Sequence, residues 1–143
     1  MWLTLLTTIW LLTGSVMDIR KRRVSVWLLL AGGVFAVTVS FLQCIGGERE
    51  YVDILKGTFP GLAFLVIAFI TQKAGYGDGI VLLCLGILSG GGKSLLLFGL
   101  SLFLISIFSL VLLILRKAGR NTRIPYLPFL TAAWLITAML IDV

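Results

Sequence analysis

Long apolar blocks, separated by short polar segments, constrain this chain more than any other feature of its sequence. A helix rises about 1.5 Å per residue, so a span of roughly 20 apolar residues is needed to cross the hydrocarbon of a bilayer. Six blocks approach or reach that length: residues 2–17, 24–45, 54–72, 79–90, 94–115 and 124–141. They predict a polytopic membrane protein.

The secondary structure of these blocks follows from backbone hydrogen bonding. In lipid, only helices and closed barrels satisfy every backbone group, and these blocks lack the alternation of barrel strands. We therefore predict an all-α fold of six transmembrane helices, forming a single transmembrane domain over residues 1–143. Because residues 79–90 are too few to cross alone, we expect this helix to be tilted, extended through the preceding GYGD stretch, or shielded by its neighbours.

The distribution of charge predicts an orientation. Nine basic residues follow the first, third and fifth spans: Arg20, Lys21, Arg22, Arg23, Lys73, Arg116, Lys117, Arg120 and Arg123. The opposite loops hold only Arg49, Lys56 and Lys93, beside acidic residues. The positive-inside rule therefore places the nine in the cytoplasm and both chain ends outside. Contact with anionic lipid accounts for the net charge of +6, so no nucleic-acid partner is expected.

This orientation puts two carboxylates at the cytoplasmic face, where ionisable groups beside hydrocarbon indicate function. Asp18 ends the first span, and Asp78 lies among Gly75, Gly77 and Gly79 at the start of the fourth. Asp18 could instead be an ordinary loop residue paired with its basic neighbours. The glycines permit close backbone approach, which would let an extended substrate lie along them, although they could instead form a flexible turn or pack helices closely.

Two carboxylates within hydrogen-bonding distance share one proton, because they cannot both ionise easily. The ionised member can activate water while the protonated member donates to a scissile carbonyl, as in aspartic proteases. The chain has no histidine, which excludes histidine-based triads and histidine zinc sites. Its two cysteines make no metal framework. We therefore expect neither a metal nor a cofactor.

Three motifs together carry a family resemblance. GYGD resembles the GxGD motif of membrane aspartyl proteases, and it occurs with MDIRKRR after the first span and IPYLPFL near the start of the last. In this order the motifs resemble the type IV prepilin peptidase family. The resemblance implies a six-helix aspartic endopeptidase that cleaves the leader of pilin-like proteins at the cytoplasmic face of a prokaryotic inner membrane. It implies catalytic roles for Asp18 and Asp78 and substrate positioning by the neighbouring glycines.

The chain departs from the family pattern in three places. Many relatives carry Ile-Pro-Asn after the first aspartate, where this chain has Val24, Ser25 and Val26. Many carry lysine two residues after the second aspartate, where this chain has Ile80. The cytoplasmic region that larger relatives use for N-methylation is absent between the first two spans, so the chain resembles the short, peptidase-only form and we expect no methyltransferase activity.

Two alternatives of a different class remain at this stage. A small proton-coupled transporter would also use two carboxylates, although transport sites usually lie near the bilayer midplane. A scaffold for pilus assembly would need no catalysis. The sequence leaves open which pilin is the substrate, the oligomeric state, and which aspartate is the general base.

Overall fold

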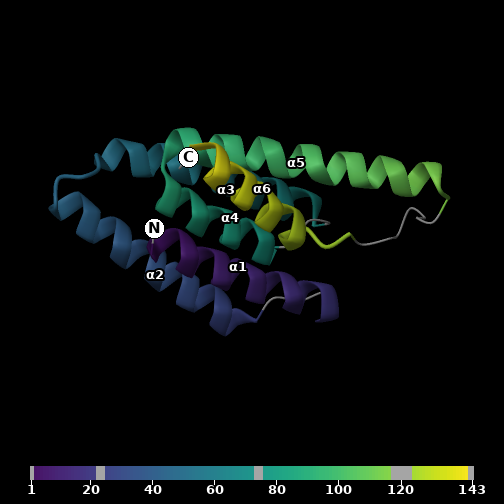
Figure 1. Ribbon diagram of the computed structural model, residues 1–143, viewed down its shortest axis with the longest axis horizontal. Helices are drawn as coiled ribbons and strands as arrows, with labels where there is room; N and C mark the ends of the chain where they lie inside the picture. The colour runs from purple at the N-terminus through teal and green to yellow at the C-terminus, as the bar shows by residue number, and fades with distance from the viewer. Residues whose placement is uncertain (1, 22–24, 73–75, 117–123, 142–143) are drawn as a thin grey trace. The chain divides into compact units, whose positions relative to one another are not determined.

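The computed structural model describes residues 2–21, 25–72, 76–116 and 124–141, and every regular element in these ranges is a helix (Figure 1). The helices are α1 (Trp2–Lys21), α2 (Val26–Ile45), α3 (Tyr51–Thr71), α4 (Tyr76–Ser89), α5 (Gly91–Ile114) and α6 (Leu127–Ile141). The predicted all-α class and the approximate positions of all six apolar blocks are thereby confirmed.

Four of the helices, α1, α2, α3 and α5, are long and apolar enough to cross a membrane. Helices α4 and α6 are also apolar, but they have only 14 and 15 residues. Many large apolar side chains on the long helices are exposed, such as Phe69 and Ile70 on α3 and Ile114 on α5. An apolar exterior of this extent is typical of helices surrounded by lipid.

The short fourth block is resolved in two of the ways that the sequence allowed. Helix α4 begins at Tyr76, so it extends into the GYGD stretch. It is also shielded, because Val81, Leu82 and Leu85 are almost completely buried. Its packing partners are α3 and α2.

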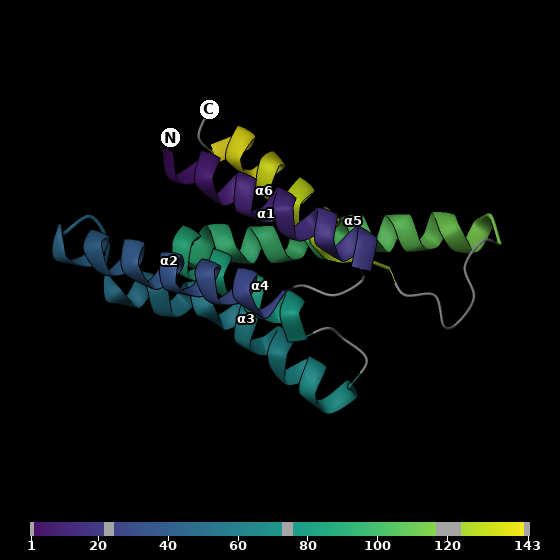
Figure 2. The same cartoon turned by 90° about the horizontal axis from the view of Figure 1, so that it is seen from below.

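The described helices fall into two compact units. Unit 1 comprises Met1–Arg22 and Leu97–Val143, and within it α1 and α6 pack side by side (Figure 2). Unit 2 comprises Arg23–Leu96, and within it α4 packs on α2 and α3. A single transmembrane domain of six spans stays a prediction.

Glycines bring the backbones of α3 and α4 into direct contact. A Cβ atom on Gly86 would overlap the carbonyl oxygen of Gly57, and one on Gly57 would overlap the carbonyl of Gly86. One turn further along, a Cβ on Gly61 would lie 2.6 Å from the Cα atom of Leu83. Small residues at such positions let membrane helices pack closely. Helix α4 is therefore held against α3 along most of its length.

A charged cluster fixes the end of α4 that lies opposite Asp78. Arg49 donates a hydrogen bond of 3.2 Å to the carbonyl of Ile87, near the end of α4. Asp53 accepts the N–H of Gly91, the first residue of α5, at 3.1 Å. Gly90 joins the two helices with φ +84°, and a Cβ there would lie 2.7 Å from Nη2 of Arg49. The cluster satisfies backbone groups that helix ends leave without partners.

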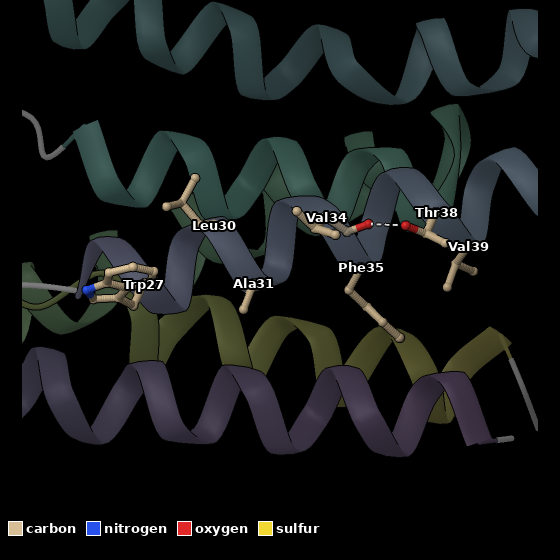
Figure 3. Close-up of a pocket in the computed structure, with 7 residues that line it drawn as sticks. All are labelled: Trp27, Leu30, Ala31, Val34, Phe35, Thr38 and Val39. Atoms are coloured by element: carbon tan, nitrogen blue, oxygen red, sulfur yellow. Dashed lines mark hydrogen bonds between the residues drawn. The ribbon is translucent and has the colours of Figure 1, made fainter.

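An open apolar depression follows one face of α2 (Figure 3). The hydroxyl of Thr38 donates to the carbonyl of Val34 in the same helix at 2.6 Å. The depression is lined by Trp27, Leu30, Ala31, Val34, Phe35, Thr38 and Val39. Because the lining is mostly apolar and the hydroxyl of Thr38 is satisfied within α2, this face suits lipid or another apolar helix better than a polar ligand.

Candidate active site

Asp18 lies in the last turn of α1 and is buried, with 8% of its surface exposed. Its Oδ2 atom accepts the backbone N–H of Leu127, the first residue of α6, at 3.3 Å. The first N–H groups of a helix have no partner within the helix, and a carboxylate at that end is also stabilised by the helix dipole. Asp18 therefore caps α6 from a neighbouring helix.

This position corrects one reading of the sequence, because Asp18 is a helical residue and not a loop residue. It forms no ion pair with Arg20 or Lys21, and its other basic neighbours, Arg22 and Arg23, lie outside the described residues. Arg20 and Lys21 are exposed, whereas the carboxylate is turned into unit 1. The structure brings Asp18 together with the IPYLPFL segment, 109 residues away in sequence.

Side-chain hydrogen bonds join α1 to α6 next to Asp18. The hydroxyls of Ser15 and Thr131 lie 2.5 Å apart and are both buried. Thr131 uses its single proton to donate to the carbonyl of Leu127 at 2.8 Å, so Ser15 is the donor between the two hydroxyls. Further along, Nε1 of Trp134 donates to the hydroxyl of Thr8 at 3.2 Å. These bonds fix the register of the two helices, and with it the place where Asp18 meets α6.

Asp78 lies in the first turn of α4, within unit 2, and is half-buried. A carboxylate in the first turn of a helix interacts favourably with the unpaired N–H groups there. Because α4 is held tightly by α3 and by the charged cluster at its other end, the backbone that carries Asp78 is well supported. Asp18 belongs to unit 1 and Asp78 to unit 2.

The three candidate glycines differ in their surroundings. Gly79 is buried, and a Cβ on it would lie 2.7 Å from Cδ2 of Leu65 on α3. Gly77 is half-buried in the first turn of α4. Gly75 lies outside the described residues. Gly79 thus has a packing contact of its own, while the role of all three in positioning substrate stays a prediction.

Three buried polar residues of unit 1, Tyr126, Ser101 and Ser15, were missed by sequence reasoning. Tyr126 immediately precedes α6, and its hydroxyl lies 2.6 Å from that of Ser101 on α5. Both belong to unit 1. The IPYLPFL motif already pointed to this segment, but nothing in the sequence indicated which helices it contacts. Ser15, in contrast, had a detectable signal, since it lies three residues before Asp18 and therefore on the same helix face.

No metal-binding group of three or more histidine, cysteine or acidic residues occurs in the parts of the chain that the structure describes. The two cysteines are free; Cys84 is buried in α4 and Cys44 is half-buried near the end of α2.

Searches of curated proteins and of solved structures found no match to this chain. The model of the type IV leader peptidase family matches residues 5–114, a range that contains both Asp18 and Asp78 and ends with α5. This match covers most of the chain and confirms the resemblance to this family, although the IPYLPFL motif lies beyond the matched range. The chain belongs to the type IV leader peptidase family.

Proposed function

We propose that the protein is a membrane-embedded aspartic endopeptidase that removes the leader of type IV pilin-like proteins at the cytoplasmic face of a prokaryotic inner membrane. Family membership supports a leader peptidase in general. The observation that carries the aspartic mechanism is the environment of Asp18, a carboxylate buried in a helix and held by the N–H of Leu127. Because burying an ionisable group beside hydrocarbon costs free energy, such a residue is a functional candidate.

In the proposed reaction, Asp18 and Asp78 face one another across the scissile bond and share one proton. The ionised carboxylate takes a proton from water as the water oxygen attacks the carbonyl carbon, and the protonated carboxyl donates to the carbonyl oxygen. The intermediate then collapses and the carbon–nitrogen bond breaks. The leaving nitrogen takes the proton that the first carboxylate removed from water, and the second carboxyl regains its proton as the carbonyl re-forms. The reaction adds one water across the peptide bond and uses neither a metal nor a covalent intermediate.

The proposed topology has six membrane crossings, with both termini outside and the basic segments in the cytoplasm. Arg20 and Lys21 follow Asp18 after one intervening residue, which is consistent with a carboxylate near the cytoplasmic boundary. Gly75 and Gly77 would leave space for an extended substrate strand beside Asp78, and Gly79 would keep α4 close to α3. We expect no N-methylation of the cleaved product.

The experiment uses the full chain, purified in detergent and incubated with a peptide that carries a pilin-type leader. Asp18→Asn and Asp78→Asn should each lower kcat by about 10³-fold or more, because neither variant can share a proton between two carboxylates. The control is Glu48→Gln, which removes one charge from an exposed residue after α2 and should cleave normally. Near-normal turnover in either Asn variant would refute the dyad.

The same preparation distinguishes the rival classes. Reconstituted in vesicles, a proton-coupled transporter would carry a proton flux that the two Asn substitutions abolish, and it would leave the peptide intact. A scaffold would show neither cleavage nor flux. Cleavage that depends on both aspartates separates the proposed peptidase from both.

A further inference from the structure

The start of α6 is fixed by a side chain that does not belong to the proposed dyad. We propose that Tyr126, together with Ser101, is a positioning pair that holds the N–H of Leu127 against Asp18. This inference rests on the proposed catalytic role of Asp18. The inference assigns a joint function to Tyr126 and Ser101. Neither the motifs nor the family match, which ends at residue 114, links these two residues.

The hydrogen bond between the hydroxyls of Tyr126 and Ser101 has a definite direction. Ser101 is completely buried and donates its single hydroxyl proton to the carbonyl of Phe98 at 2.8 Å. Its oxygen can therefore only accept from Tyr126, 2.6 Å away, and the tyrosine hydroxyl is the donor. Tyr126 is itself buried, with 5% of its surface exposed. Its side chain thus ties the entrance of α6 to α5.

The backbone of Tyr126 also takes part in the start of α6. The carbonyl of Tyr126 accepts the N–H of Leu130 at 3.1 Å, the first hydrogen bond of α6. Tyr126 is therefore the N-cap residue, and the next N–H along the chain, that of Leu127, is the one that Asp18 accepts. Pro128 follows with no N–H and a restricted φ, which stiffens this turn further. The peptide between Tyr126 and Leu127 is thus held by α5 on one side and by α6 on the other.

The position of the Asp18 carboxylate depends on the turn at the start of α6. Among the described residues, the carboxylate of Asp18 accepts the N–H of Leu127, so the direction of that N–H decides where Oδ2 lies. Loss of the Tyr126 hydroxyl would free the peptide to rotate, and Asp18 would spend less time in the reactive geometry. Because Tyr126 would act through Leu127 and not through the substrate, the change should appear in kcat and leave KM unaltered.

The experiment compares Tyr126→Phe, Ser101→Ala and the double variant in the full chain. The matched control is Ser106→Ala on α5, the helix that also carries Ser101, where an exposed serine donates to the carbonyl of Leu102. With kcat expressed per folded molecule, both single variants should fall by about three- to tenfold, in line with the loss of one buried hydrogen bond. The double variant should fall no further than the singles, because the two hydroxyls act as one unit.

A second readout does not depend on turnover. In an Asp78→Asn background, the rate at which dicyclohexylcarbodiimide modifies Asp18 is followed by mass spectrometry. We expect about two- to tenfold faster modification in Tyr126→Phe and Ser101→Ala, because the carboxyl is less tightly held, and no change in Ser106→Ala.

The outcomes separate this inference from the proposed function. Near-normal cleavage by Asp18→Asn would overturn the proposed function, and the modification rate would then still report whether Tyr126 holds Asp18. Loss of cleavage in Asp18→Asn, with Tyr126→Phe behaving like Ser106→Ala in both assays, would overturn the positioning pair alone. A Tyr126→Phe variant that lowers only the folded fraction would also overturn it, since the role would then be structural.

Discussion

Gly79 and Leu65 are in direct contact across α4 and α3: a Cβ atom on Gly79 would lie 2.7 Å from Cδ2 and 2.9 Å from Cγ of Leu65. Side-chain carbons do not approach so closely, so only glycine fits without movement. Gly77 is two residues earlier and only half-buried. The two glycines that flank Asp78 therefore lie in different environments, and substitutions at each should have different effects.

Alanine at Gly79 should cost little compared with alanine at Gly61. The obstacle at Gly79 is the end of a leucine side chain, which can move, whereas the obstacle at Gly61 is the Cα atom of Leu83. We expect Gly79→Ala to lower the free energy of unfolding by about 1 kcal/mol and Gly61→Ala by about 3 kcal/mol, the range found for overpacked cores. Thermal unfolding in detergent measures both. Equal losses would contradict the backbone contact between α3 and α4.

Valine at Gly77 should impair cleavage while leaving the protein folded. A β-branched side chain restricts the backbone and would block close approach of a substrate strand beside Asp78. We expect kcat/KM to fall by about 10²-fold, the loss that a misplaced substrate can cause. The control is Gly99→Val on α5, where a Cβ meets nothing within 4 Å. Full activity in Gly77→Val would mean that this glycine serves only the local backbone.

The sequence predicted the helices well because their signal is local. Apolar blocks and the breaks between them lie within short windows, and the helix boundaries agree with the predicted blocks to within a few residues. The start of α4 inside GYGD was one of the alternatives that the sequence allowed. The contacts of the site were not predictable in the same way, since Leu127 reaches Asp18 across 109 residues. No pattern in a single sequence specifies which backbone N–H a distant carboxylate will accept.

The charged residues after α2 illustrate the same limit. The sequence placed Arg49 and Asp53 in a loop, where the positive-inside rule assigns them no role beyond orientation. In the structure, these side chains bind the carbonyl of Ile87 and the N–H of Gly91, which belong to the ends of two other helices. Gly90 has a positive φ and joins those two helices. Such roles depend on tertiary contacts and cannot be read from composition.

Removal of Arg49 should destabilise unit 2. Its guanidinium donates to the carbonyl of Ile87 and to the side chain of Gln43, and lies 3.7 Å from Asp53. We expect Arg49→Ala to cost about 2 kcal/mol, the typical value for hydrogen bonds made by a charged group. Glu48→Ala, an exposed charge next to it, should cost less than about 0.5 kcal/mol. Thermal unfolding in detergent would reveal the difference. Similar midpoints for the two variants would show that the charged cluster contributes nothing to the stability of unit 2.

The position of the cut within the substrate tests the proposed membrane geometry. In the proposed substrates, a short basic leader precedes a long apolar helix, and we expect cleavage where they meet. Peptide bonds inside a helix are hydrogen-bonded and shielded, so the bond must lie in a locally extended stretch before water can attack it. A dyad at the cytoplasmic face could reach such a boundary while the apolar helix stays in lipid.

We therefore expect a single cut at the leader–helix boundary and none near the centre of the apolar helix. Mass spectrometry of both products from a reconstituted reaction locates the bond. A substrate whose boundary is moved three residues into the apolar segment, roughly 5 Å along a helix, serves as the control and should be cut much more slowly, because its scissile bond then lies in hydrocarbon. Cuts scattered along the apolar helix would instead indicate a general intramembrane protease, and the proposed position of Asp18 and Asp78 at the membrane face would be wrong.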